Sequence, residues 1–259
     1  MKLKQTLLIA LFGAVSIGSQ AQRQVPITAA EKTFEEGKQL FVQKNFPAAT
    51  RLLQEYVKQK GLPYETVSEA DYMLACSAYE LKNKESVAIL QHYLKEYPES
   101  PYRNRVNALI GNAYFYQEKY AESIEEFERC NLDALPNEER DECTLHQAIA
   151  YIETGDLQKA YVLLSVVEAC SKVYRDEANY YKAYIDYSEG RYDQALPLFE
   201  NLRDSKQFGS EVPFYIADID LAQKRYAEAQ KEITAAMANG TGSMSAKSSA
   251  HHAPGWSAR

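Results

Sequence analysis

Hydrophobic and polar positions along the chain follow the period of an amphipathic α-helix, and short polar turns interrupt this pattern at regular intervals. Four strings, at 111–123, 151–160, 187–195 and 222–229, show the same order of residues. Each has a helix-like stretch, a polar turn, an aromatic residue or Leu, and a small residue three positions later. Self-similarity of this kind predicts a repeat architecture in which every unit is one helix pair.

One frame aligns six repeats, and its first column holds small residues, 34 to 38 positions apart, at Gly37, Ala75, Gly111, Ala148, Ala183 and Ala217. The second column, twelve residues further on, holds Ala49, Val87, Ser123, Ala160, Ala195 and Ala229. The third column, four positions later, holds Leu53, Gln91, Phe127, Leu164, Phe199 and Ile233. Nine residues after the first column stand Phe46, Lys84, Tyr120, Leu157, Tyr192 and Tyr226. Only the second repeat breaks the last two columns, at Gln91 and Lys84.

The columns have a direct physical meaning. Two antiparallel helices approach closely only where both present small side chains, and the large apolar residues around the crossing bury against the partner helix and the next pair. The frame therefore predicts six helix pairs, at about 30–63, 68–101, 104–137, 141–172, 176–206 and 210–238. N-cap residue types predict the helix starts at Ser68, Asn104, Asp141, Asp176 and Ser210.

These columns resemble the tetratricopeptide repeat, a helix–turn–helix unit of about 34 residues. The resemblance covers residues 28–238 and implies an all-α fold, a right-handed superhelical solenoid of about six antiparallel helix pairs. The stretch Tyr97–Tyr102, running into Gly111–Phe127, also looks like repeats in bacterial envelope-assembly proteins of this family. That second resemblance implies an association with envelope-assembly machinery.

The first 21 residues are typical of a secretory signal. Two lysines precede an apolar core at 7–17, and Ser19 and Ala21 supply the small residues of a cleavage site. A membrane anchor is the alternative, but the apolar run is shorter than the roughly 20 residues that span a bilayer. We therefore expect an exported protein, in the periplasm or at the extracytoplasmic face of the envelope.

The last residues, 239–259, are rich in Ser, Ala and Gly and show no helical period. A solenoid needs a polar capping helix after its last repeat, because the apolar face of that repeat otherwise stays in contact with water. We expect this segment to be a disordered, non-native tail, and the original protein to continue into further repeats after residue 238.

Composition and candidate chemistry argue against several function classes. The formal net charge of −7 disfavours nucleic acid as a partner, because phosphate binding needs clustered Lys and Arg. The chain has no phosphate-binding glycine loop and no nucleophile elbow. His92 and His146 are single histidines on expected helices, most simply explained by packing or surface exposure, and His251 and His252 lack a second pair of zinc ligands. We expect no enzymatic activity, no cofactor and no metal.

The family resemblance implies a concave groove lined by the first helix of each pair. Its aromatic positions here are Phe34, Phe41, Tyr72, Tyr79, Phe115, Tyr116, Tyr180, Tyr184, Tyr187 and Phe214. Its acidic positions, near the helix starts, include Glu69, Glu142, Glu177 and Glu211. Core packing between repeats is the alternative explanation for the aromatic residues. For the glutamates it is the helix dipole, which favours a carboxylate in the first turn wherever the side chain points.

Two function classes remain open. One is a protein–protein interaction scaffold or adaptor of the bacterial cell envelope, which binds an apolar or basic polypeptide segment in the aromatic, acidic-edged groove. The other is a carbohydrate- or small-ligand-binding module, because stacked tyrosines also suit sugar rings, and the chain has 20 tyrosines. A continuous channel would favour the peptide, and an isolated deep pocket would favour the small ligand.

An exported protein with four cysteines invites a disulfide. In the repeat frame Cys143 begins the first helix of the fourth pair and Cys170 ends its second helix, so antiparallel packing would bring them together. Cys130 is the competing partner for Cys143, and Cys76 is expected to be a buried free thiol. Four reduced, packed cysteines are the alternative.

Overall fold

The computed structural model describes residues 28–238, and this part of the chain folds into α-helices and one short 3-10 helix, without strands. The helices are α1 Ala29–Val42, α2 Phe46–Val57, α3 Tyr64–Glu80, α4 Ser86–Glu96, α5 Arg103–Tyr116, α6 Tyr120–Glu128, η1 Leu132–Ala134, α7 Asn137–Thr154, α8 Leu157–Cys170, α9 Arg175–Ser188, α10 Tyr192–Asn201, α11 Val212–Ala222 and α12 Tyr226–Ala238. None of these helices is long and apolar enough to cross a membrane. The expected signal at 1–21 and tail at 239–259 lie outside the described residues.

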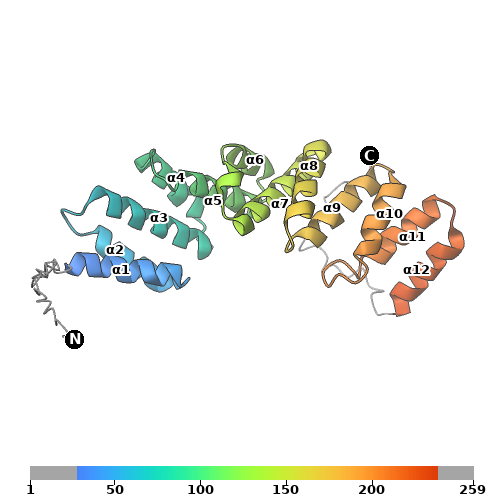
Figure 1. Cartoon of the computed structure of the whole chain (residues 1–259), viewed down its shortest axis with the longest axis horizontal. Helices are drawn as coiled ribbons and strands as arrows, with labels where there is room; N and C mark the ends of the chain where they lie inside the picture. Colours follow the sequence, from blue (N-terminus) through green and yellow to red (C-terminus); the bar gives the residue numbers. More distant parts are fainter. Residues whose placement is uncertain (1–27, 239–259) are drawn as a thin grey trace, which may run out of the picture.

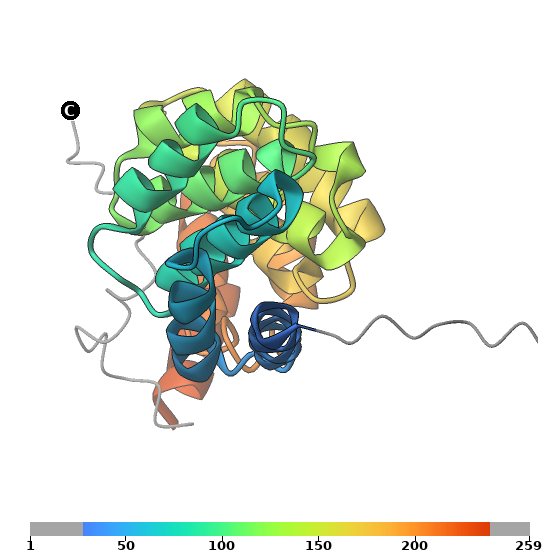
Figure 2. The same ribbon diagram turned by 90° about the vertical axis from the view of Figure 1, so that its left-hand side faces the viewer.

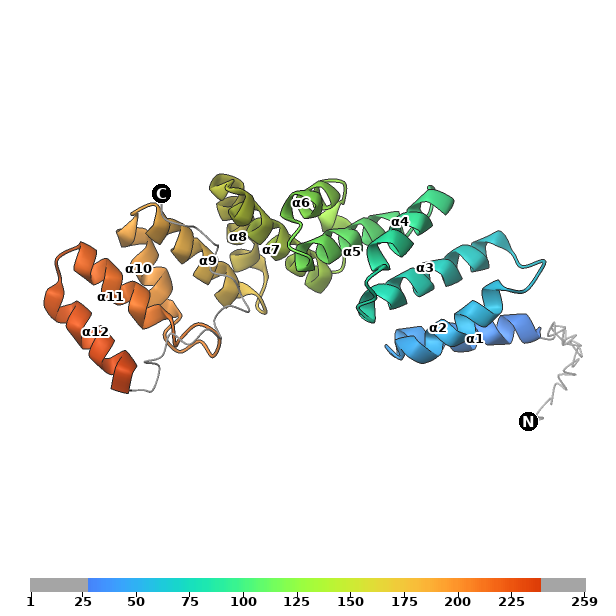
Figure 3. The same ribbon diagram turned by 180° about the vertical axis from the view of Figure 1, so that it is seen from behind.

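The helices between residues 28 and 238 form six antiparallel pairs that follow one another along an arch (Figure 1). We call the first helix of each pair inner and the second outer, because in the middle of the arch α3, α5, α7 and α9 lie below α4, α6 and α8. Each helix packs against the next along the chain, and inner helices α1, α3, α5 and α7 also contact one another in succession. Seen end-on the pairs wind around an axis (Figure 2), and from behind α1–α2 and α11–α12 stand at opposite ends (Figure 3).

The crossing of α5 and α6 explains the small residues of the frame. Ser123 Oγ donates a hydrogen bond of 2.9 Å to the carbonyl oxygen of Gly111. A Cβ atom on Gly111 would lie only 2.8 Å from ring carbons of Phe127. In the fourth pair Ala148 and Ala160 are completely buried at the corresponding crossing. The all-α prediction is confirmed for residues 28–238, and the small positions of the frame are buried in every pair except the second.

In the second pair the two buried small residues, Ala75 and Ser86, are eleven residues apart, whereas the frame assumed a spacing of twelve. Ser86 and Leu90 are buried there, at 6% and 0% exposure, in place of the predicted Val87 and Gln91. Helix α4 begins at Ser86, eleven residues after the small residue of its inner helix. The outer helices of the other pairs begin nine residues after the small residue of theirs. The missing residue leaves Lys84 and Glu85 in a turn before α4.

The turn between the two helices of a pair has the same backbone geometry in all six described pairs. The residue seven positions after the first small residue has a positive φ, at Lys44, Lys82, Glu118, Gly155, Gly190 and Lys224. The N–H of the next residue bonds to the carbonyl five residues back, as in Asn45 to Leu40 and Asp156 to Tyr151. This is the Schellman ending of a helix, which satisfies carbonyl groups that the helix leaves unpaired.

The predicted N-caps were wrong, because the inner helices do not start at the polar residues of the frame. Helices α3 and α7 begin directly after Pro63 and Pro136, and this places Ser68 and Asp141 inside them. Asn104 is the second residue of α5, and Asp176 holds the corresponding place in α9. Ser210 precedes α11 by two residues. Asn104 instead holds the loop after α6, since its Oδ1 accepts from Asn131 N–H at 2.7 Å.

The apolar core is divided near the middle of the arch. One cluster of buried residues extends from Phe34 to Ile110 and another from Leu145 to Ile219. Between them lies a small cluster that includes Phe127 and Cys143. Helices α5 and α7 also carry buried polar residues, namely Asn107, Asn112, Thr144, His146 and Gln147, and Asn112 and His146 bond to each other between the two helices. The junction of the third and fourth pairs therefore has a polar part.

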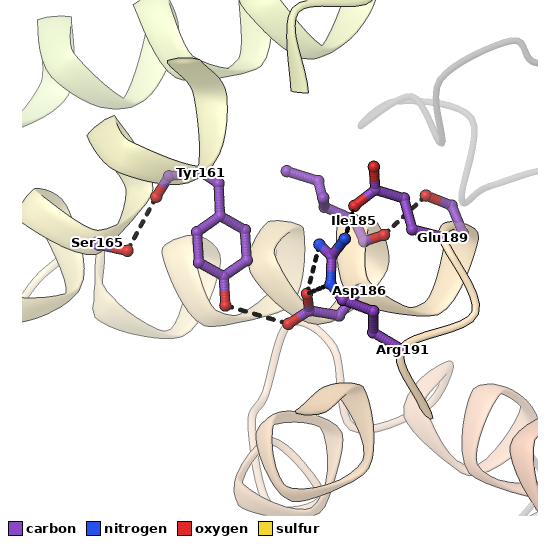
Figure 4. A network of polar contacts seen from close by, with 7 residues as sticks. Tyr161, Ser165, Ile185, Asp186, Glu189 and Arg191 are labelled. Carbon is purple, nitrogen blue, oxygen red and sulfur yellow. Dashed lines mark hydrogen bonds and ion pairs between the residues drawn. The ribbon is translucent and has the colours of Figure 1, made fainter. Parts of the chain in front are cut away.

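A buried carboxylate links the fourth and fifth pairs (Figure 4). Asp186, on α9, is completely buried and accepts a hydrogen bond of 3.1 Å from the hydroxyl of Tyr161, on α8. Arg191, in the turn after α9, bonds to the same carboxylate through Nε at 2.8 Å and Nη2 at 2.7 Å. Arg191 also contacts the exposed Glu189. The network holds the turn of one pair against the outer helix of the pair before it.

The four cysteines are free thiols in the structure, and only Cys76 and Cys143 are buried. Helix α7 begins six residues before Cys143, so this residue lies in the second turn, 1% exposed, and not at the helix end. Cys170 is exposed at the end of α8. Cys130 donates to the carbonyl of Asn104 at 3.4 Å.

Candidate functional site

The predicted groove residues all lie on inner helices or next to them, but three of the aromatic residues are buried in packing. Phe34, Tyr72 and Tyr180 are only 4–7% exposed. Tyr72 stacks on Tyr102 with ring centroids 4.0 Å apart, and Tyr180 stacks on Phe208 at 4.2 Å. These three rings hold neighbouring helices together, as the packing alternative had it.

Five further aromatic residues of the predicted groove are half-buried, namely Phe41, Phe115, Tyr184, Tyr187 and Phe214. Phe115 stacks on His146, with centroids 4.1 Å apart. Tyr184 meets the ring of Tyr215 edge-on at 6.1 Å, and the hydroxyl of Tyr187 donates to Asp218. Each of these rings therefore packs on the fold with one part and leaves another part accessible.

The predicted glutamates are half-buried, and three of them, Glu69, Glu142 and Glu211, contact neighbouring inner helices. Glu69 forms an ion pair of 2.7 Å with Lys38 of α1. Glu211 accepts a hydrogen bond of 3.2 Å from the hydroxyl of Tyr180. Glu177 lies in the first turn of α9. These carboxylates thus contribute to contacts between successive pairs as well as to the charge of the inner side.

The structure brings Tyr79, Tyr116 and Glu142 together around one cavity of about 720 Å³, which we call the Tyr79 pocket. Its remaining lining residues are Glu80, Lys82, Asn83, Lys84, Ser86, Ala113 and Gln117. The pocket thus lies between the ends of inner helices α3 and α5, with the α3–α4 turn on one side and α7 on the other.

Partial burial shapes the electrostatics of this pocket. Burial raises the pKa of Tyr79, and burial together with the carboxylate of Glu142 raises that of Tyr116 to about 12. Burial also raises the pKa of Glu142, and Glu80 and Glu139 nearby act in the same direction. The Tyr116 hydroxyl donates to Glu142 at 3.5 Å, which partly opposes that shift. The pocket therefore offers neutral phenols beside a carboxylate.

Comparison with known proteins supports the repeat assignment. Residues 69–100, which include most of α3 and all of α4, match the tetratricopeptide-repeat family model. The structure of MamA AMB-1 superposes with a TM-score of 0.56 at 14% sequence identity, over 69% of this chain and 92% of MamA. The fold is a tetratricopeptide-repeat solenoid.

Two other solved structures superpose on this fold. YrrB, described as a TPR protein with an unusual peptide-binding site, superposes with a TM-score of 0.55 at 14% identity, over 72% of this chain and 91% of YrrB. The apo form of RapI superposes with a TM-score of 0.56 at 14% identity, over 81% of this chain and 64% of RapI. No curated protein matches the sequence.

Asn112 separates Cys143 from His146 where the third and fourth tetratricopeptide repeats meet. Its amide nitrogen donates to Cys143 Sγ at 3.5 Å, and its Oδ1 lies 2.8 Å from His146 Nδ1. Burial raises the pKa of Cys143 to about 12 and lowers that of His146 to about 4, so both groups are neutral at pH 7. A catalytic cysteine needs a thiolate beside a base, so this trio is a packing network. Residues 28–238 contain no cluster of three or more His, Cys, Asp or Glu residues that could hold a metal ion.

Sequence reasoning did not find the residues of the α3–α4 turn that line the Tyr79 pocket, namely Lys82, Asn83 and Lys84. It also missed Ala113 and Gln117 of the third tetratricopeptide repeat. One signal was present in the sequence. The second repeat is the one that breaks the large-residue columns, at Lys84 and Gln91, and the pocket lies at the first of these breaks.

Proposed function

We propose that this protein is an interaction scaffold that binds a polypeptide segment along the inner helices of its solenoid. Successive inner helices contact one another from α1 to α7 and provide an extended surface. Concave surfaces of this kind are what repeat proteins use for binding. The peptide-binding site named for YrrB supports the same use of the fold.

The Tyr79 pocket is the observation that carries this proposal. It is an open cavity at the ends of inner helices α3 and α5, and of the two tyrosines in its lining Tyr116 is 62% exposed. Large rigid rings that stay exposed in the free protein are typical anchors of binding surfaces, because they contribute contact area with few rotors to order. Because the lining carries Lys82 and Lys84 as well as Glu80 and Glu142, we expect the bound segment to place an apolar side chain here.

We further propose that the protein acts outside the cytoplasm, as an adaptor of the bacterial cell envelope associated with its assembly machinery. The support for export is the signal-like sequence of residues 1–21. Mass spectrometry of the N-terminal peptide from cells would test it. The expected mature chain begins at Gln22, and a chain that retains residues 1–21 would contradict export.

A small ligand such as a carbohydrate is the second candidate, because the Tyr79 pocket has a volume of about 720 Å³. A pocket of this size can enclose a small molecule, and tyrosine rings stack on sugars. Titration with oligosaccharides, followed by tyrosine fluorescence, separates the two candidates. Saturable oligosaccharide binding that Tyr79→Ala abolishes would favour the small-ligand function.

The proposal is tested with three substitutions on inner helices, Tyr79→Ala, Tyr116→Ala and Tyr184→Ala, combined in one variant. None of these rings is fully buried, so we expect the fold to survive, which circular dichroism checks. We expect the variant to lose at least about tenfold in affinity for the native partner, since anchor residues carry most of an interface's free energy. The control replaces Val162 and Val166, exposed on outer helix α8, by Ala. Unchanged binding in the inner variant with loss in the control would contradict the proposal.

A further inference from the structure

Aromatic side chains bridge the two helices of a pair in three of the repeats. Phe41, near the end of α1, meets Phe46 at the start of α2 with centroids 5.7 Å apart. The equivalent pairs are Phe115 with Tyr120 at 5.9 Å and Tyr187 with Tyr192 at 6.1 Å. In each pair the first ring lies four residues, and the second nine residues, after the small residue of the inner helix. The second ring thus fills the space between the end of the inner helix and the start of the outer one.

The second repeat keeps the first ring of this arrangement but lacks the second. Tyr79 stands four residues after Ala75, and the position nine residues after Ala75 is Lys84. Counting back from Ser86, the small residue of α4, gives Asn83 instead. Because this repeat is one residue shorter, the turn that would carry the ring is not helical. The Tyr79 pocket lies at this place, with Tyr79, Asn83 and Lys84 in its wall.

We propose that the Tyr79 pocket receives an aromatic side chain of the bound polypeptide, in the space that the chain's own second ring fills in other repeats. This inference rests on the proposed function and names the side chain that the scaffold recognises. The ring would pack against Tyr79 as Phe46 packs against Phe41, with Ala113 and Tyr116 as the other walls. Aromatic rings prefer edge-to-face and offset contacts with each other, which an aliphatic side chain does not make.

The charges around the pocket favour a neutral side chain. Two carboxylates, Glu80 and Glu142, and two ammonium groups, Lys82 and Lys84, line it, so the formal charges of the lining balance. A charged side chain of either sign would therefore be attracted by two lining residues and repelled by the other two. A ring with a polar edge, such as that of Tyr or Trp, can bury its face and still donate a hydrogen bond to Glu142, which already accepts one from Tyr116.

The test uses the full chain and three probes, the N-acetyl amides of tyrosine, leucine and arginine, with binding followed by NMR shifts of the Ala113 methyl group. We expect saturable shifts with the tyrosine amide and an affinity about three- to tenfold above that of the leucine amide. Equal or tighter binding of the leucine or the arginine amide would overturn the assignment, as would tyrosine-amide binding without shifts at Ala113.

The decisive variant is Lys84→Tyr, which returns the missing ring to the chain. We expect it to fill the pocket and to bind the tyrosine amide at least about tenfold more weakly than Lys84→Ala, which removes the same charge without adding a ring. Gln117→Trp fills the pocket from the opposite wall, and it serves as second variant if Lys84→Tyr perturbs the circular dichroism spectrum. Undiminished binding in a folded filling variant would overturn the proposal.

The two proposals fail in different ways. Tyrosine-amide binding needs no partner protein, so it can persist when the native partner does not bind along the inner helices. That result would contradict the scaffold function and leave the pocket assigned to a free aromatic ligand. Partner binding that survives Lys84→Tyr undiminished would instead retain the scaffold and remove the Tyr79 pocket from its interface.

Discussion

Gly111 sets the distance between α5 and α6, because the ring of Phe127 occupies the space of the missing Cβ atom. The carbonyl of the same residue accepts the hydrogen bond from Ser123, so the two helices are joined where they are closest. The side chain of Ser123 is completely buried, which makes this bond worth about 1 kcal/mol by the usual range. One glycine thus fixes both the packing and the polar contact of the third pair.

Replacement of Gly111 by Ala should lower the free energy of unfolding by about 1–2 kcal/mol, since overpacking against a buried ring outweighs the roughly 1 kcal/mol by which Ala is the better helix former. Gly37→Ala is the matched control in the first pair. Its Cβ atom would meet Leu53 at 3.0 Å, and a Leu side chain adjusts more easily than a ring, so we expect a change within about 0.5 kcal/mol of zero. Urea denaturation measures both variants. Equal effects of the two substitutions would show that Phe127 does not limit the approach of the helices.

At the scale of elements, the buried Asp186 joins outer helix α8 to the turn after inner helix α9 (Figure 4). We expect Asp186→Ala to destabilise by about 1–3 kcal/mol, because it leaves the half-buried Tyr161 hydroxyl without its acceptor and removes the buried carboxylate that Arg191 binds. Glu189→Ala is the control, since Glu189 contacts the same Arg191 but is exposed, and should cost less than about 0.5 kcal/mol. Thermal unfolding of both variants is the measurement. A loss as small for Asp186→Ala as for Glu189→Ala would show that the network contributes little.

The helices themselves could be predicted from the sequence because each pair repeats the same small and large positions. Their starts could not, since Pro63 and Pro136 begin α3 and α7 well before the polar residues taken as caps. The same early start of α7 moved Cys143 away from the helix end, where a bridge to Cys170 was expected. Local residue preference decides weakly where a helix begins when packing continues past it.

Part of the lining of the Tyr79 pocket could be predicted from the sequence. Tyr79, Tyr116 and Glu142 follow from the groove positions that the family resemblance implies, and the structure places all three at one cavity. That Tyr72 and Tyr180 are buried instead could not be deduced, because their partner rings, Tyr102 and Phe208, lie in loops outside the repeat frame. The break at Lys84 was visible, but its meaning depends on the one-residue shortening of the turn.

At the scale of the whole molecule, the polar junction between α5 and α7 makes the stability of the solenoid depend on pH. Burial lowers the pKa of His146 to about 4 from its ordinary value of 6.5, so the unfolded chain binds a proton at a higher pH than the folded chain does. Its contribution is constant above about pH 7 and becomes destabilising as the pH falls from about 6.5 to about 4. Between pH 7 and pH 4.5 we expect a loss of about 2–3 kcal/mol from this residue.

His146→Gln isolates this loss from that of the carboxylates, which titrate in both proteins. Gln removes the ionisable ring and can still donate to Asn112 Oδ1. Urea denaturation of both proteins at pH 7 and pH 4.5 gives two differences in unfolding free energy. The drop should be smaller for His146→Gln by about 2–3 kcal/mol. Parallel drops would contradict the burial of a neutral imidazole at the junction.

Photo-crosslinking from two single positions tests the central claim, that the inner side binds a polypeptide, most directly. A benzoylphenylalanine residue replaces either Gln117, exposed at the Tyr79 pocket, or Val166, 47% exposed on outer helix α8, and cells that make the protein are irradiated. We expect the residue at 117 to give one discrete crosslinked polypeptide, and the residue at 166 to give none of it. Crosslinks of that polypeptide from position 166 alone would contradict the account and place the binding surface on the outer helices.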